Sequence, residues 1–241
     1  MLPLRDNIPH FRPPFVTYCL IALNCLFFLW EISLGPHLFG AIENLGFVPA
    51  RFLEEILSTD APLFQAILPT FTSIFLHAGL LHLVANMWFL LIFGDNVEDI
   101  LGHSLYFFFY LVCGVGANLI YLCLAPNTTT PLIGASGAIA GVMGAYFSLF
   151  PTARILTLFL IVIFPIFLEL PAYFFLGLWF LLQFLFGIFS QVAPITGKTG
   201  GVAWWAHVGG FAIGLLLIRF MVPDHVWLPL RRRWRNRPEN D

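Results

Sequence analysis

Charged residues are scarce in this chain, in which only 10% of the 241 residues are Asp, Glu, Lys or Arg. An average soluble domain carries about 25% charged residues, so this shortage excludes a soluble globular fold. The chain instead has 59% hydrophobic residues, 28 of its residues are Phe, and its mean hydropathy is +0.88. Long apolar runs of this kind indicate a protein that crosses a membrane several times.

Cysteine is also rare, and a His-Glu-x-x-His motif is absent. All four cysteines fall inside apolar runs, where a thiol behaves as a small hydrophobe. They are Cys19, Cys25, Cys113 and Cys123. We therefore expect no disulfide framework, no metal and no cofactor, and we expect no nucleic-acid partner.

Turn residues and charges divide the apolar sequence into spans of about the length that a bilayer requires. The predicted spans cover residues 15–32, 75–93, 105–124, 136–150, 171–189 and 204–220. The fourth span is short, so we expect other helices to surround it. The charged stretch 94–99 is expected to end the second span. The connection 33–70 contains a partly amphipathic stretch at 52–57, which indicates an interfacial or re-entrant element.

The stretch 155–189 holds 35 residues with one charge. As a single helix it would extend ~52 Å, which is too long for one crossing of a ~30 Å hydrocarbon core. Pro165, Glu169 and Pro171 are the candidates that interrupt it. Residues 155–170 then form either a separate span or an interfacial stretch, and this choice sets the side on which the chain ends.

The distribution of basic residues decides between these alternatives, because Lys and Arg concentrate on the cytoplasmic side. Six spans place nine of the eleven basic residues inside and leave Arg51 and Lys198 outside. The nine are Arg5, Arg12, Arg154, Arg219 and the five arginines between positions 231 and 237. We therefore predict an all-α polytopic bundle of six helices in a bacterial cytoplasmic membrane, with both termini cytoplasmic. Its parts are a cytoplasmic segment 1–14, a membrane domain 15–220 and a basic cytoplasmic tail 221–241.

Four polar residues stand within or at the ends of these spans, where polar side chains are costly and therefore indicate function. They are His82, Asn86, Ser136 and His207. In the six-span topology every even-numbered helix starts on the outer side, so His82, Ser136 and His207 lie at one depth. This shared depth predicts one polar site that opens outward.

Ser136 stands in the sequence Gly134-Ala-Ser-Gly137, at the start of a predicted helix. One interpretation is an N-cap serine followed by packing glycines. The other is a nucleophile beside helix-terminal N–H groups that can hold an oxyanion. Gly137, Gly141 and Gly144 form a small-residue face on which another helix can approach closely.

A matching ridge of Ala206, Gly210 and Gly214 lies in the sixth span. Packing of the two ridges would bring His207 close to Ser136, where an imidazole can act as general base for the hydroxyl. The alternative is a structural histidine bonded to a backbone carbonyl.

His82 and Asn86 are four residues apart and therefore share one helix face. Both can donate hydrogen bonds, either to a reacting group or as contacts between helices. On a common helix His77 would be rotated by about 140° from His82, which argues against a two-histidine metal face.

These three patterns, on alternate helices and in this order, resemble the rhomboid family of intramembrane serine proteases. They are His82-x-x-x-Asn86, Gly134-Ala-Ser136-Gly137 and Ala206-His207-x-x-Gly210-x-x-x-Gly214. The resemblance covers roughly residues 64–220. It implies a six-helix rhomboid-like bundle in which 33–70 forms a membrane-embedded hairpin beside the active site.

The resemblance further implies a serine–histidine dyad, with Ser136 as nucleophile and His207 as general base and acid. His82, Asn86 and the backbone N–H of Ser136 would line the oxyanion hole. Partners would be membrane lipids and substrates that are transmembrane segments, with small residues at the cut and helix-destabilising residues nearby. No oligomeric state is implied.

Two positions depart from the family pattern. Many members have an aromatic residue four positions after the serine that stacks on the catalytic histidine, whereas this chain has Ala140, so Phe or Tyr from other helices is expected to substitute. Some members carry a Trp-Arg pair before the second span, where this chain reads Leu68-Pro-Thr-Phe71.

Other classes of function compete with a protease. A transporter should show internal repeats, and we find none that is convincing. A catalytically inactive binding scaffold of the same fold is the stronger alternative, although relatives of that kind lack the serine or the histidine.

The predicted topology can be tested with reporter fusions at Asn127 and Asn240. We expect the two reporters to lie on opposite sides of the membrane, because the fourth span starts outside and the basic tail stays inside. Reporters on the same side would contradict the six-span topology.

Overall fold

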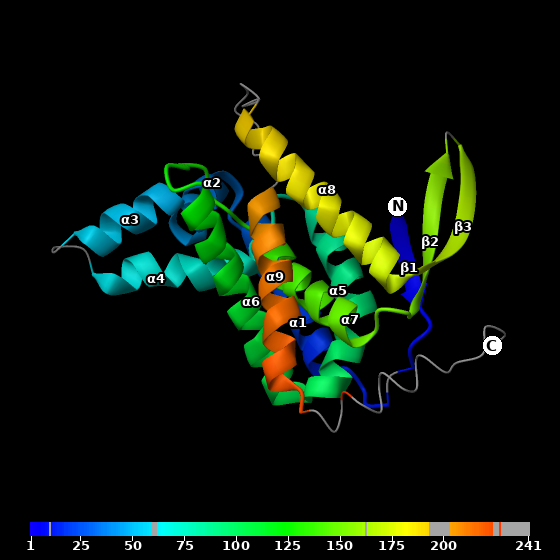
Figure 1. Ribbon diagram of the computed structural model, residues 1–241. Helices are drawn as coiled ribbons and strands as arrows, with labels where there is room; N and C mark the ends of the chain where they lie inside the picture. Colours follow the sequence, from blue (N-terminus) through cyan, green and yellow to red (C-terminus); the bar gives the residue numbers. More distant parts are fainter. Residues whose placement is uncertain (10, 59–61, 162, 193–202, 224–226, 228–241) are drawn as a thin grey trace.

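The computed structural model describes the whole chain except residues 10, 59–61, 162, 193–202, 224–226 and 228–241. Most of the described chain is helical (Figure 1). Lys198 and most of the predicted tail 221–241, including its five arginines between positions 231 and 237, lie outside the described residues.

Among the described residues, five helices are long and apolar enough to cross a membrane. They are α1 (Phe15–Ser33), α5 (Leu80–Leu101), α6 (His103–Leu124), α8 (Ala172–Val192) and α9 (Trp204–Met221). The chain is therefore a multi-pass membrane protein. A sixth crossing depends on α7 (Ser136–Leu149), which has 14 residues, so the count of six stays a prediction.

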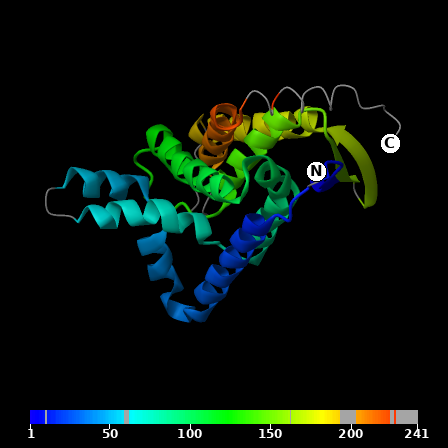
Figure 2. The ribbon, with the colours of Figure 1, turned by 90° about the horizontal axis from the view of Figure 1, so that it is seen from below.

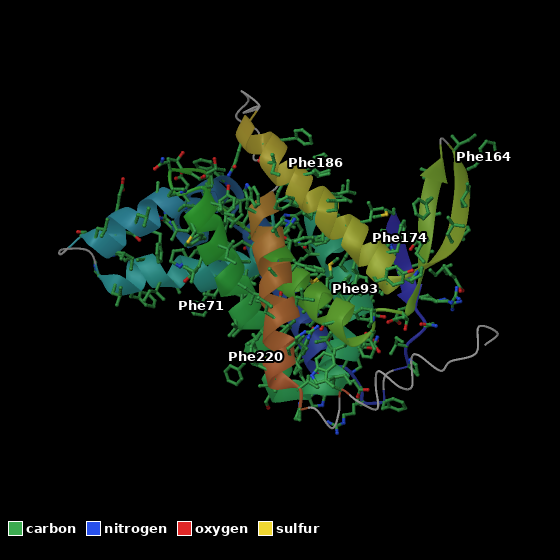
Figure 3. The ribbon with its side chains drawn as sticks, in the orientation of Figure 1. Phe71, Phe93, Phe164, Phe174, Phe186 and Phe220 are labelled. Carbon is green, nitrogen blue, oxygen red and sulfur yellow. The ribbon has the colours of Figure 1, made fainter. Side chains whose placement is uncertain are left out.

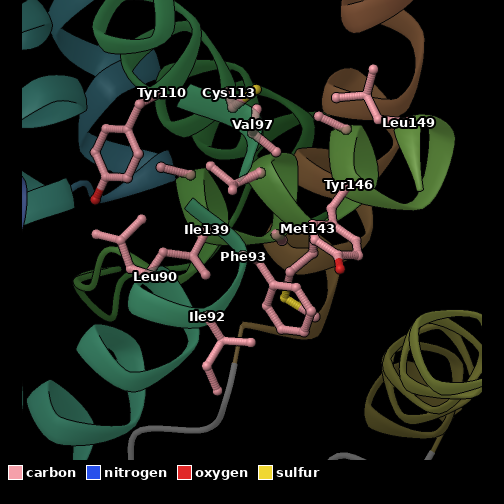
Figure 4. Close-up of a cluster of buried hydrophobic side chains, with 14 of the residues drawn as sticks. Leu90, Ile92, Phe93, Val97, Tyr110, Cys113, Ile139, Met143, Tyr146 and Leu149 are labelled. Atoms are coloured by element: carbon pink, nitrogen blue, oxygen red, sulfur yellow. The ribbon is translucent and has the colours of Figure 1, made fainter. Parts of the chain in front are cut away.

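Helix α7 lies in the middle of the bundle and packs against α5, α6 and α9 (Figure 1). Nearly all of its residues are buried, as expected for a short helix that other helices surround. Figure 4 shows part of this core, in which Leu90 and Phe93 of α5 lie beside Ile139 and Met143 of α7. This burial keeps the start of α7 in a fixed place.

The prediction for the second span was wrong at both ends. Helix α5 begins at Leu80 rather than at 75, and it runs through the charged stretch 94–99 to Leu101. It ends at Gly102, whose φ of +75° favours glycine.

The charged stretch does not end the helix, because the carboxylate of Glu98 accepts hydrogen bonds inside the protein. Glu98 is 1% exposed and accepts hydrogen bonds from the backbone N–H groups of Val16 and Thr17, both at 2.8 Å. These N–H groups lie in the first turn of α1 and have no partner within their own helix. The carboxylate of Glu98 therefore joins the start of α1 to the end of α5.

A three-stranded antiparallel sheet corrects the all-α prediction. Its strands are β1 (Leu2–Asp6), β2 (Arg154–Ile161) and β3 (Phe164–Pro171), in the order β1-β2-β3. Residues 155–170 are thus a hairpin, and the alternative of a separate helical span is wrong. Pro165 has no N–H to contribute to a helix interior, whereas an edge strand tolerates it. The pairing of β1 with β2 spans some 150 residues of sequence, so no local pattern predicts it.

The hairpin lies to one side of the bundle, beyond α8 (Figure 1). The apolar side chains of β3 are largely exposed, whereas Ile155 of β2 is buried, and Phe164 stands near the end of the hairpin, away from the helices (Figure 3). Exposed phenylalanines also mark the outer surfaces of the helices, as at Phe174 and Phe186 of α8 and Phe220 of α9. Such surfaces suit contact with lipid.

The connection 33–70 is almost entirely helical. It contains the short turn η1 (Gly35–His37) and the helices α2 (Leu38–Leu45), α3 (Pro49–Leu57) and α4 (Leu63–Thr72), and the turn η2 (Ser73–Phe75) follows. The amphipathic stretch 52–57 lies in α3. Helices α3 and α4 run side by side and project from the bundle (Figures 1 and 2). Their position in the membrane stays a prediction.

Arg51 of α3 holds this connection in place. Its guanidinium donates hydrogen bonds to the backbone carbonyls of Glu43 and Gly46, the latter at 2.9 Å. Arg51 therefore supplies an anchor in a chain that has no Trp-Arg pair before the second span.

The structure packs the two predicted glycine ridges against each other. A Cβ placed on Gly210 would overlap the carbonyl oxygen of Gly137, and one on Gly214 would overlap that of Gly141. A Cβ on Gly144 would overlap the carbonyl of Phe211 in the same way. The backbones of α7 and α9 thus approach as closely as only glycine allows.

We expect Gly210→Ala to lower the melting temperature, because the new methyl group would have to displace the backbone of α7. Overpacking of this kind costs about 1–3 kcal/mol. The matched control is Gly177→Ala in α8, where the added Cβ would meet only Phe147 at 3.9 Å. Thermal unfolding of both variants in detergent measures the difference, and equal melting temperatures would contradict the close contact.

Candidate active site

Ser136 and His207 are in direct contact. The Oγ atom of Ser136 lies 2.7 Å from Nε2 of His207. Ser136 is the first residue of α7, the N-cap position belongs to Ala135, and no side chain caps the helix. The N-cap interpretation of Ser136 is therefore wrong, and the hydroxyl faces the imidazole instead.

The second ring nitrogen of His207 also has a side-chain partner. Its Nδ1 lies 2.7 Å from Oε1 of Gln183 in α8. The interpretation of His207 as a histidine bonded to a backbone carbonyl is therefore wrong. The Trp179 ring, also of α8, lies 5.9 Å from the imidazole at an interplanar angle of 32°. Because Ala140 has no ring to offer, a tryptophan supplies the contact that was expected from Phe or Tyr.

His82 lies against the segment that leads to Ser136. A Cβ on Gly134 would come within 2.9 Å of Nε2 of His82 and 3.7 Å of Oγ of Ser136. Gly134 also has a φ of +130°, so both its conformation and its surroundings require glycine. The Nδ1 atom of His82 accepts a hydrogen bond from the N–H of Ala78 at 3.4 Å. This bond leaves the proton on Nε2, the nitrogen that faces the site.

The segment before Ser136 is held from two sides. The N–H of Gly134 donates to the carbonyl of Ser73 at 2.8 Å. Phe47 and Leu132 exchange backbone hydrogen bonds of 3.0 and 2.7 Å. Phe47 of the connection 33–70 and Ser73 of the turn η2 thereby fix the backbone that presents the serine.

Asn86 is a buried donor without an acceptor. The residue is 7% exposed, and its Nδ2 has no hydrogen-bond partner among the described residues. A side chain that joins two helices would donate this hydrogen bond to an acceptor on the neighbouring helix. The unsatisfied donor fits a role in binding a ligand better than a role in joining helices.

The position of His77 corrects the prediction that His77 and His82 point to different faces of one helix. The helix begins at Leu80, so His77 is not on it, and the rings of His77 and His82 lie only 5.2 Å apart. Burial, and then the neighbouring His82, lower the pKa of His77 to about 4, so its ring is neutral at physiological pH. No cluster of three or more His, Cys, Asp or Glu suited to a metal occurs in the described part of the chain.

Gln183 is the site residue that sequence reasoning missed. The signal was present, because an amide in the apolar run 171–189 is as unusual as the four polar residues that were singled out. The sequence did not show which neighbour the amide faces. That required the tilt and rotation of α8, which only packing sets.

A cavity of about 640 Å³ lies between the end of α6, the segment 125–132, the end of α8 and the start of α9. Trp204, Trp205 and Pro131 are among the residues that line it, whereas Ser136 and His207 are not. Ser136 and His207 are themselves half-buried.

The arrangement defines a class of protein: a multi-pass helical membrane protein in which a half-buried serine is hydrogen bonded to an imidazole. The rhomboid domain family model matches residues 65–224, which is more than half of the chain. The chain therefore belongs to the rhomboid family.

Individual relatives agree with this assignment. The yeast (Saccharomyces cerevisiae) "Rhomboid protein 1, mitochondrial" is 28% identical over 88% of this chain and 56% of its own length. "RHOMBOID-like protein 6, mitochondrial" of Arabidopsis thaliana is 33% identical over 66% of this chain and 46% of its own. The human "Presenilin-associated rhomboid-like protein, mitochondrial" is 35% identical over 38% of this chain and 25% of its own. The matches thus span about half, or less, of the length of these relatives.

If this site hydrolyses peptide bonds and the Asn86 amide donates to the oxyanion, Asn86→Ala should lower turnover of a transmembrane substrate by about 10²–10³, the usual effect of removing one oxyanion donor. Ser136 should still react with a fluorophosphonate, because the nucleophile is intact. His82→Ala should behave similarly.

The matched control is Asn24→Ala, which removes a buried asparagine whose Nδ2 donates to the carbonyl of Leu20 at 2.7 Å. That variant should lose thermal stability, by about 0.6 kcal/mol for an average intramembrane hydrogen bond, and keep its turnover per folded molecule. Wild-type turnover in Asn86→Ala would exclude Asn86 from the site.

Proposed function

We propose that this protein is an intramembrane serine endopeptidase that cleaves transmembrane segments with a Ser136–His207 dyad. The observation that carries the proposal is the 2.7 Å contact between Oγ of Ser136 and Nε2 of His207. The contact joins residues 71 positions apart, at the crossing of two helices whose glycines permit the approach.

In the proposed reaction Nε2 of His207 takes the hydroxyl proton while Oγ of Ser136 attacks the peptide carbonyl. The resulting oxyanion accepts hydrogen bonds from Nε2–H of His82, Nδ2–H of Asn86 and the backbone N–H of Ser136. His207 then gives the proton to the leaving amine. Water hydrolyses the acyl-enzyme by the same steps.

Burial strengthens each of these contacts, because hydrogen bonds to a developing charge are stronger where the dielectric is low. Water must still reach the serine, and the polar groups around it provide a place for water within an apolar protein. A site that opens to the outer side would admit this water without crossing the bilayer.

The expected substrates are transmembrane helices that unwind easily. A helix in lipid satisfies all of its backbone groups internally, so its carbonyls cannot be attacked until it opens. Small residues at the cut and helix-destabilising residues nearby would lower the cost of that opening.

A catalytically inactive binding scaffold is the second candidate. Membership of the rhomboid family does not by itself distinguish an active protease from an inactive scaffold. The hydrogen-bonded serine and histidine, together with the unpaired amide of Asn86, favour the enzyme.

The orientation belongs to the same proposal. Both termini face the cytoplasmic side, six helices cross the membrane, and the serine opens outward. The mitochondrial names of the relatives offer no support for a bacterial cytoplasmic membrane, so the proposal extends to the orientation and not to the organelle.

We expect Ser136→Ala and His207→Ala each to abolish cleavage of a transmembrane substrate. The double variant should lose little more, because residues that act as one unit are strongly non-additive. The matched control is Ser148→Ala, which removes a buried hydroxyl from the far end of the same helix and should leave turnover unchanged.

Fluorophosphonate labelling gives a second readout. Wild-type protein and Ser148→Ala should be labelled, and Ser136→Ala should not. Substantial cleavage by Ser136→Ala would end the serine-protease proposal, and an unlabelled, uncleaving wild-type protein would favour the scaffold.

A further inference from the structure

We infer that Gln183 is a positioning residue that holds His207 in its reactive tautomer, so that the catalytic unit is Ser136–His207–Gln183. The inference rests on the proposed protease function and adds a third residue to it. It concerns the second ring nitrogen of the histidine, which the dyad leaves unused.

The direction of the hydrogen bond carries the inference. The structure turns Oε1 of Gln183, an oxygen without a proton, toward Nδ1 of His207 at 2.7 Å, and in this orientation of the amide Nδ1 donates. A neutral imidazole carries one proton. With that proton on Nδ1, Nε2 presents its lone pair to the hydroxyl of Ser136, which is the arrangement that a general base needs.

The other tautomer would be inactive. A proton on Nε2 would point at Oγ of Ser136 and could not be replaced by the proton of the hydroxyl. A donor or a backbone N–H beside Nδ1 would favour this inactive form. The identity of the group at Nδ1 therefore decides whether His207 can act as a base.

The surroundings of Gln183 shield its amide from water. The residue is 8% exposed, so water competes little for the hydrogen bond. Trp179 precedes Gln183 by four positions and therefore lies on the same face of α8. Its ring covers the imidazole, and Trp204 meets the imidazole edge-on with ring centroids 6.4 Å apart. The imidazole is thus held at both nitrogens, on one face and at one edge.

An amide has an advantage over a carboxylate at this position. A carboxylate could also accept from Nδ1, but an ionised group inside a membrane protein is costly. Glutamine supplies the same acceptor without a buried charge. This choice suits a histidine that lies between membrane helices.

A purely structural role is the alternative, in which Gln183 only joins α8 to α9. Gln191 of the same helix shows such a role, because its Nε2 donates to the carbonyl of Leu124 at 3.4 Å. Gln191→Met is therefore the matched control for Gln183→Met. Both substitutions keep the approximate length of the side chain and remove the amide.

The first measurement reads the tautomer directly and needs no turnover. In ¹⁵N-histidine-labelled protein, His207 is assigned by comparison with His207→Ala, and its two nitrogen shifts report which atom bears the proton. We expect the proton on Nδ1 in wild-type protein and in Gln191→Met. In Gln183→Met we expect it to move to Nε2, whereas Gln183→Glu should keep it on Nδ1.

The second measurement is cleavage kinetics. We expect Gln183→Met to lower kcat by up to about 10⁴, the loss that a wrong tautomer causes in a serine–histidine–aspartate protease, with KM nearly unchanged. Gln183→Glu restores the acceptor and should recover much of this loss. Gln191→Met should match the wild type in kcat, and melting temperatures identify any loss that comes from misfolding.

Two results would overturn the inference. One is a proton that stays on Nδ1 of His207 in folded Gln183→Met, and the other is a kcat equal to that of the wild type in this variant. Failure of the proposed function looks different, because the wild-type protein would then neither cleave nor react with a fluorophosphonate. The nitrogen shifts would still decide whether Gln183 sets the tautomer.

Discussion

The close contact of α7 with α9 is the constraint on which the site depends. Helices in a membrane gain little from burying apolar surface against each other, because lipid is equally apolar. They gain from close packing, and here Gly210 and Gly214 of α9 lie against the carbonyls of Gly137 and Gly141. Any side chain at these positions would push the helices apart. His207 would then move away from Ser136, because the two residues lie at the same end of this contact.

The remaining groups of the site come from different helices, and each is fixed by a polar contact of its own. Gln183 reaches the imidazole from α8, and His82 enters from the start of α5 beside Gly134. The backbone before Ser136 is held by Ser73 and Phe47. Because unsatisfied polar groups are costly in an apolar interior, each contact stabilises one arrangement against others. The donor of Asn86, one helical turn after His82 on α5, has no such partner among the described residues.

Hydrophobic patterning predicted the places and order of the five long helices that the described residues contain, because a helix in lipid must be apolar for its full length. It failed where charged residues found partners inside the protein. Glu98 was interpreted as the end of a span, whereas it accepts hydrogen bonds from the start of α1. It also failed at residues 155–170, where the strand that pairs with the hairpin comes from the other end of the chain.

The sequence by itself determined the membrane class, the family and the positions of Ser136, His207, His82 and Asn86, because local spacing and composition carry that information. Only the tertiary structure decided the partner of each polar atom. Gln183 is visible in the sequence as an isolated amide, but its orientation toward Nδ1 of His207 depends on how α8 is tilted and rotated against α9. These angles follow from the packing of whole helices, and no short stretch of sequence specifies them.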